Sequence, residues 1–131
     1  MIKFKGWFFV LLISLSLFGM TACSDGGANS YEQITPQEAK TIMDTEKDFY
    51  LIDARTDEEF AEGHIADAIL IPEYEIAARA EKELPDKDAL ILVYCRSGRR
   101  SKIASEELVK LGYTNVKEFG GIIDWPYEVV K

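Results

Sequence analysis

Cys95 is the residue whose setting in this sequence most clearly suggests chemistry. It directly follows the apolar run of residues 89–94 and precedes the segment Arg96-Ser97-Gly98-Arg99-Arg100-Ser101. Three of the chain's five arginines therefore lie within five residues of one thiol. Nearby guanidinium groups, backbone N–H groups around a glycine and a helix expected to start near Ser101 all favour an anion at sulfur. We expect Cys95 to be a nucleophile rather than an inert buried thiol.

The composition limits the classes of protein to which this chain can belong. Its 131 residues are enough for one domain, and a hydrophobic fraction of 47% excludes a wholly disordered chain. The formal net charge of −8 argues against nucleic acid as the main partner. Two cysteines are too few for a disulfide framework, and one histidine provides no histidine cluster for a metal. No cofactor is expected.

Short apolar runs alternate with amphipathic segments after residue 31. The runs at 49–53, 68–71 and 89–94 are typical of buried strands, and residues 116–119 are expected to form a last strand. Helices are expected over 36–45, 57–62, 73–84 and 101–111. Capping boxes starting at Thr35 and Thr56 mark two of the helix starts. This alternation predicts an α/β fold with a parallel sheet, helices on both faces and residues 89–94 as the central strand.

The last predicted helix is expected to bury four apolar side chains: Ile103, Ala104, Leu108 and Leu111. Gly112 is its expected stop, and Gly120-Gly121 is expected to turn the chain into a short helical end. In an open α/β sheet, ligands bind at the carboxyl ends of the strands. Cys95, directly after the predicted central strand, is therefore at the edge where chemistry is expected.

Three motifs, in order along the chain, resemble those of single-domain rhodanese-like sulfurtransferases. The segment from Cys95 to Ser101 is similar to the active-site loop of that family. A family pattern of the form DxR, then E-[FY]-x-x-G-H-I-x-x-A and I-P, resembles Asp53-Ala54-Arg55, then Glu59-Phe60-Ala61-Glu62-Gly63-His64-Ile65-Ala66-Asp67-Ala68 and Ile71-Pro72. Gly120-Gly121-Ile122-Ile123-Asp124-Trp125 resembles the family's carboxyl-terminal G-G…W element. The resemblance implies a rhodanese-like three-layer α/β/α fold with a mainly parallel central sheet.

The same resemblance implies persulfide chemistry. Cys95 is expected to take a sulfane sulfur from a donor such as thiosulfate and to pass it to cyanide or to a thiol acceptor, for example a thioredoxin-like protein. The N–H groups from Arg96 to Ser101, including those of Ser97 and Gly98, are expected to hold the persulfide. Arg99 and Arg100 are candidates for binding the donor oxyanion. Arg96 either joins them or turns away to pair with a carboxylate.

Residues outside the loop are expected to support it. Asp53, at a neighbouring strand end, is expected to accept hydrogen bonds from the loop and to fix its shape. Arg55 and Glu59 are expected to form a structural ion pair. His64 is interpreted as a hydrogen-bonded structural residue, although a catalytic role is the alternative. Trp125 is interpreted as a core or rim aromatic, with gating of the substrate as the alternative.

Two other functions remain open at this point. Dual-specificity phosphatases and arsenate reductases share the fold, but their loop places five residues between Cys and Arg. Four residues separate Cys95 from Arg100, so the loop fits an added sulfur better than a tetrahedral phosphate. The other alternative is a non-enzymatic module that carries sulfur or binds a partner protein.

The amino-terminal segment is expected to direct export. Lys3 and Lys5 precede an apolar stretch, and Met20-Thr21-Ala22-Cys23 resembles a bacterial lipobox, with Met20 where Leu is usual. This predicts a signal peptide over residues 1–22, a lipidated Cys23 with a tether over 23–30, and a rhodanese-like domain over 31–131. The protein is then exported and anchored to a membrane of the cell envelope. A retained short anchor and a non-lipidated, secreted Cys23 are the alternatives.

Overall fold

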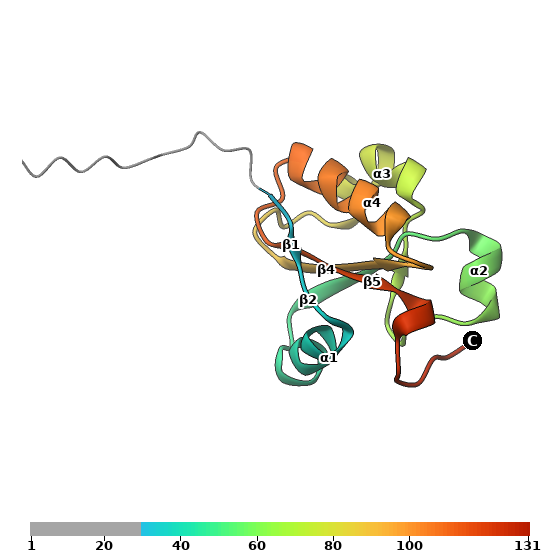
Figure 1. Cartoon of the computed structure of the whole chain (residues 1–131). Coiled ribbons are helices and arrows are strands. Elements are labelled where there is room, and N and C mark those ends of the chain that lie inside the picture. Colours follow the sequence, from blue (N-terminus) through green and yellow to red (C-terminus); the bar gives the residue numbers. More distant parts are fainter. Residues whose placement is uncertain (1–29) are drawn as a thin grey trace, which may run out of the picture.

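A parallel five-stranded sheet forms the centre of the protein, seen in a computed structural model that describes residues 30–131 (Figure 1). The strand order is β1-β5-β4-β2-β3, and all neighbouring strands pair in parallel. The strands are β1 (Glu32–Gln33), β2 (Phe49–Asp53), β3 (Ile69–Leu70), β4 (Leu90–Cys95) and β5 (Val116–Gly121). The predicted parallel α/β fold is confirmed, with β4 as the central strand.

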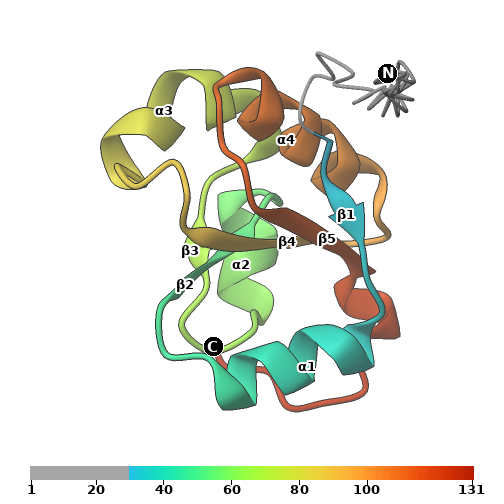
Figure 2. The same ribbon diagram turned by 90° about the vertical axis from the view of Figure 1, so that its left-hand side faces the viewer.

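Helices cover both faces of this sheet (Figure 1, Figure 2). On one face lie α3 (Ile76–Glu83) and α4 (Arg99–Lys110), and on the other lies α1 (Pro36–Thr45). The core on the α3 and α4 side contains Ile52, Ala54, Ile71, Ile76, Ala80, Leu84, Ile91, Val93, Cys95, Ala104, Leu108, Tyr113 and Val116. The core on the α1 side contains Ala39, Leu51, Ile65, Leu92, Tyr94, Phe119 and Trp125. The expected three-layer α/β/α arrangement is therefore confirmed.

The helix starts follow from local capping. Thr35 and Glu38 form the complete reciprocal capping box ahead of α1. Thr56 caps α2 (Asp57–Glu62) by accepting from the backbone N–H of Glu59 at 3.3 Å. The carboxylate of Glu59 accepts no hydrogen bond from the backbone N–H of Thr56, because it pairs with Arg100 instead. The second capping box is thus only half formed.

Several element boundaries differ from the predicted ones. α4 begins at Arg99 rather than near Ser101, because Gly98 turns the chain with a φ of 105° and the helix follows at once. β5 runs on through Gly121 instead of ending before the two glycines. A one-turn 3-10 helix, η1 (Glu73–Glu75), precedes α3 within the predicted 73–84 helix. β3 is limited to two residues, and β1 has no counterpart among the predicted strands.

The predicted buried face of α4 is correct except at one residue. Ala104 and Leu108 are fully buried, and Leu111 packs against the same core. Ile103 is 36% exposed, so its predicted burial is wrong. α4 turns Ile103 away from the sheet, and Ser101 and Ser105 occupy buried positions on the inner face instead.

The amino-terminal predictions fall outside the described part of the chain. The signal peptide over 1–22, Cys23 and all but the last residue of the tether precede residue 30. Within residues 30–131, no helix has both the length and the apolar character needed to cross a membrane.

Candidate active site

Cys95 closes the central strand and is almost fully buried, with 1% of its surface exposed. The N–H of Gly98 donates a hydrogen bond to its Sγ at 2.9 Å. The Oγ of Ser101, in the first turn of α4, lies 3.3 Å from the same sulfur. The loop after β4 and the start of α4 thus form a polar cradle around one sulfur atom. The predicted position of Cys95 at the carboxyl edge of the sheet is confirmed.

Gly98 shapes this cradle. Its φ of 105° lies in the region that residues with a side chain rarely adopt, and it caps the 12-residue helix α4. Because α4 starts directly after Gly98, its amino-terminal dipole lies beside the thiol. Arg99 and Arg100 consequently stand on the helix rather than in an extended loop. Their side chains therefore diverge.

Gly121 allows the loop and β5 to approach each other closely. It is the register partner of Cys95 across β4 and β5. A Cβ atom at residue 121 would lie 1.9 Å from the carbonyl oxygen of Arg96 and 2.5 Å from the Cα of Ser97. The N–H of Ile123 donates to that same carbonyl at 3.2 Å. The loop can therefore lie this close to β5 only because residue 121, the second glycine of the G-G…W element, has no side chain.

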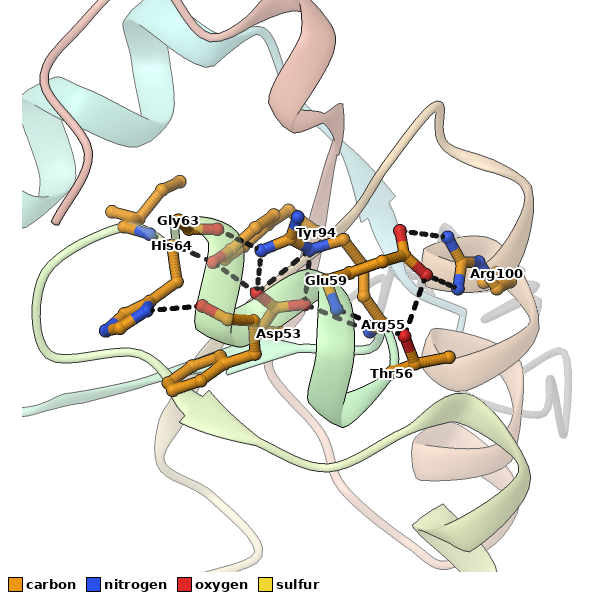
Figure 3. Close-up of polar contacts among 10 residues, drawn as sticks. Asp53, Arg55, Thr56, Glu59, Gly63, His64, Tyr94 and Arg100 are labelled. Atoms are coloured by element: carbon orange, nitrogen blue, oxygen red, sulfur yellow. Dashed lines mark hydrogen bonds and ion pairs between the residues drawn. The ribbon is translucent and has the colours of Figure 1, made fainter. Parts of the chain in front are cut away.

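Arg100 is held by an ion pair with Glu59 on α2 (Figure 3). Its Nη1 and Nη2 donate to Oε1 and Oε2 of Glu59 at 2.6 and 2.9 Å. This bidentate contact, opposed by partial burial, lowers the pKa of Glu59 to about 2. It also raises the pKa of Arg100. The predicted ion pair between Arg55 and Glu59 is wrong, because Glu59 turns toward α4.

Arg55 pairs instead with Asp53, the last residue of β2 (Figure 3). Its Nε and Nη2 donate to both carboxylate oxygens of Asp53 at 2.7–3.1 Å, and Nη2 also donates to the carbonyl of Gly63 at 2.6 Å. The hydroxyl of Tyr94 donates to Asp53 at 2.6 Å, and burial raises the pKa of Tyr94. Asp53 makes no hydrogen bond to residues 96–101 within the described structure, so its predicted role as a loop acceptor is wrong.

Arg96 and Arg99 are exposed on the outer side of the cradle. Neither forms an ion pair within residues 30–131, so the predicted alternative in which Arg96 pairs with a carboxylate is not found there. Of the three arginines in the motif, Arg100 is therefore held in an ion pair, whereas Arg96 and Arg99 present their charges to solvent.

His64 and Trp125 have structural surroundings, as predicted. The Nδ1 of His64 lies 2.9 Å from the carbonyl of Phe60, and the two rings stack with centroids 3.7 Å apart. Trp125 is 9% exposed and packs against Phe119 at a centroid distance of 5.5 Å. Both positions fit residues that hold the fold around the site.

The structure adds one residue that the motifs do not mark. Glu118 on β5 is only 2% exposed, and its Oε1 lies 2.6 Å from Ser101 Oγ. A sequence signal exists, because Glu118 is a charged residue two positions after the buried Val116 in a strand. Alternation along a strand places both side chains on the same inner face.

Residues 35–126 match the family model for the rhodanese-like domain. This chain belongs to the rhodanese-like domain family. Thiosulfate sulfurtransferase PspE of Escherichia coli is 40% identical over 80 residues, covering 61% of this chain and 77% of that protein. A protein of Allochromatium vinosum named Sulfurtransferase is 43% identical over 88 residues, covering 66% and 79%.

A solved structure also resembles this rhodanese-like domain. The structure described as "rhodanese with anions from E. coli" has a TM-score of 0.59 and 39% sequence identity to this chain. The match covers 63% of this chain and 96% of that one. The fold reached from the strand order and layers is therefore that of the rhodanese-like family.

Proposed function

We propose that this rhodanese-like protein is a sulfurtransferase that carries a sulfane sulfur as a persulfide on Cys95. The proposal rests on the cradle at Cys95, where Gly98 N–H, Ser101 Oγ and the start of α4 all face one sulfur atom. The names of the two relatives, both sulfurtransferases, support the same reaction class.

The chemistry follows from a thiolate at Cys95. The thiolate attacks the sulfane sulfur of thiosulfate, a new S–S bond forms, and the bond to the sulfonate sulfur breaks, so that sulfite leaves with the electron pair. The Gly98 N–H and the α4 dipole stabilise negative charge on the protein-bound sulfur. A second nucleophile, cyanide or an external thiol, then removes the outer sulfur and restores the thiolate.

The direct test is transfer of sulfur from thiosulfate to cyanide, measured as thiocyanate. The purified domain is expected to form thiocyanate with ping-pong kinetics, because sulfite leaves before cyanide reacts. A protein that binds thiosulfate but forms neither sulfite nor thiocyanate would instead be a binding module, and the proposal would fail.

Arg96 and Arg99 are the residues proposed to bind the sulfonate group of the donor. Both are exposed and outside any ion pair within the described residues, whereas Arg100 is bound to Glu59. Arg99→Ala is expected to raise the KM for thiosulfate by about tenfold, which corresponds to loss of one charge-assisted hydrogen bond. Arg96→Ala is expected to act in the same direction. The measurement is steady-state kinetics with thiosulfate.

An uncharged donor provides the control for this arginine prediction. The KM for a neutral organic persulfide or thiosulfonate ester is expected to change little in Arg99→Ala. Equal increases in KM for charged and uncharged donors would show that Arg99 acts on the loop rather than on the donor's charge. Lys102→Ala, which removes an exposed cation on the same helix, is the matched surface variant.

We also propose that the protein is exported and anchored by lipid on Cys23. The support is the sequence alone: Lys3 and Lys5, the apolar stretch after them and the segment ending at Ala22-Cys23. Cys23→Ala is expected to move the protein from the membrane fraction to the soluble fraction in a bacterial host with lipoprotein processing. Retention in the membrane fraction would indicate an uncleaved anchor instead.

A further inference from the structure

Glu118 is a buried carboxylate to which the sulfur chemistry described above assigns no part. It projects from β5 beneath the active-site loop, with 2% of its surface exposed. Its Oε1 accepts from the N–H of Gly120 at 2.7 Å and from the hydroxyl of Ser101 at 2.6 Å. No lysine or arginine within residues 30–131 forms an ion pair with it. Burying a carboxylate without an ion-pair partner costs folding free energy, so the presence of Glu118 at this position requires a reason.

Ser101 connects this carboxylate to the thiol. Its side chain is fully buried, and its Oγ lies between Glu118 Oε1 at 2.6 Å and Cys95 Sγ at 3.3 Å. A hydroxyl has one proton to donate. An ionised carboxylate at the shorter distance takes that hydrogen bond, because charge-assisted bonds are the stronger ones. Ser101 can then only accept from Cys95, which holds the proton on the thiol.

We propose that Glu118 is a positioning residue for Cys95, with which it shares one negative charge through the hydroxyl of Ser101. In one arrangement Cys95 is a thiol that donates to Ser101, and Ser101 donates to the Glu118 carboxylate. In the other, the Cys95 proton has moved to Ser101 and the Ser101 proton to Glu118. Cys95 is then a thiolate that accepts from Ser101, and Glu118 is a carboxylic acid that donates to Ser101. No proton is gained or lost.

The consequence for reactivity is that Glu118 opposes the fully ionised thiolate. Two negative charges linked through one hydroxyl compete for its proton, because Ser101 can donate to only one of them. Formation of a persulfide anion is expected to turn the Ser101 hydroxyl toward sulfur and to favour the acid form of Glu118. The inference rests on the proposed role of Cys95, but it concerns the free thiol and can be tested without sulfur transfer.

One charged side chain acts on the Cys95 end of these hydrogen bonds. The bond to Glu59 is the largest cause of the raised pKa of Arg100 on α4, and the charges of Cys95 and Asp53 also raise it. The positive charge of Arg100 therefore favours the thiolate. Arg100 is retained when Glu118 is changed, so it does not alter the direction of the expected effect.

The Glu118 end faces one further titratable side chain. Burial, with the charges of Glu106 and Glu118, raises the pKa of Tyr31, which precedes β1. Tyr31 makes no hydrogen bond to Glu118 within the described residues. It therefore remains neutral over the range in which a thiol titrates.

The test is the pH dependence of Cys95 alkylation by iodoacetamide in wild type and in Glu118→Gln. Gln keeps an acceptor for the Gly120 N–H but carries no charge and takes up no proton. The midpoint of the alkylation profile is expected to fall by about one pH unit in Glu118→Gln, because a neighbouring negative charge disfavours the thiolate by about that amount. An unchanged or higher midpoint would overturn the inference. Glu106→Gln removes one exposed carboxylate from α4 and is expected to leave the midpoint in place.

A second measurement covers the case in which Glu118→Gln folds poorly. The carboxyl ¹³C signal of Glu118 in wild type, followed by NMR as pH rises, is expected to shift in two steps, the upper one coinciding with alkylation. In Cys95→Ser, which cannot form a thiolate, a single step is expected. Identical titration of Glu118 in the two proteins would contradict the shared charge. Failure of these tests would leave thiocyanate formation unaffected, so the two proposals fail separately.

Discussion

Cys95→Ser is expected to lower the transfer of sulfur from thiosulfate to cyanide by at least about three orders of magnitude. A serine hydroxyl is a far weaker nucleophile than a thiolate, and Cys95 is the sole cysteine in residues 30–131. The expected change is in kcat, because the exposed side chains of Arg96 and Arg99 remain in place to bind the donor. Steady-state thiocyanate formation measures it.

The control for this variant is its stability. Serine is close to cysteine in size, and its oxygen can accept the hydrogen bond from Gly98 N–H, so the melting temperature is expected to stay near that of wild type. If Cys95→Ser retained a substantial fraction of the wild-type turnover while folded, sulfur would not pass through Cys95.

Gly121→Ala is expected to lower both the activity and the stability of the protein. The added Cβ would lie 1.9 Å from the carbonyl oxygen of Arg96 and 2.5 Å from the Cα of Ser97, and both of these are backbone atoms that cannot easily move aside. Overpacking of this kind costs about 1–3 kcal/mol of unfolding free energy. The loop must also shift relative to Cys95, and misplacement by about 1 Å can lower a rate by about 100-fold. Urea unfolding and kcat/KM for thiosulfate are the measurements.

Gly120→Ala is the matched control for this prediction. Gly120 has a φ of 89°, so alanine there is strained, but a Cβ at that position meets no atom within 4 Å. The activity of Gly120→Ala is therefore expected to fall much less than that of Gly121→Ala. If the two variants lost activity equally, backbone strain in the G-G pair, rather than the contact with the loop, would explain the effect.

The sheet and the place of the nucleophile could be predicted because their signals are local. The apolar run that becomes β4 is long enough to identify a buried central strand, and Cys95 follows it directly. The Thr35 capping box and its proline define α1 almost to the residue. These features depend on residues a few positions apart, which a single sequence displays.

The partners of the charged side chains could not be predicted in the same way. Arg100 and Glu59 are 41 residues apart, and their contact depends on how α2 and α4 meet across the end of the sheet. Arg55 and Asp53 are only two residues apart, yet their pairing depends on both side chains being buried beside Tyr94. The sequence shows where charged residues stand along the chain, but it does not show which of them contact each other in the fold.

Glu118 illustrates the same limit for the site. Its strand is predictable, and a charge facing the core of a strand is unusual enough to notice. Its contact with Ser101 depends on the parallel pairing of β5 with β4 and on the early start of α4 at Arg99. Each of these is a tertiary feature, so the link between the carboxylate and the thiol emerges only from the assembled fold.

The most direct test for a persulfide on Cys95 is the intact mass of the protein after incubation with thiosulfate. Wild type, freed of excess donor, is expected to gain the mass of one sulfur atom, to lose it on addition of cyanide, and to release an equal amount of thiocyanate. Cys95→Ser is expected to gain nothing. A wild-type protein that forms thiocyanate without ever gaining this sulfur, or a Cys95→Ser protein that gains it, would contradict a persulfide on Cys95.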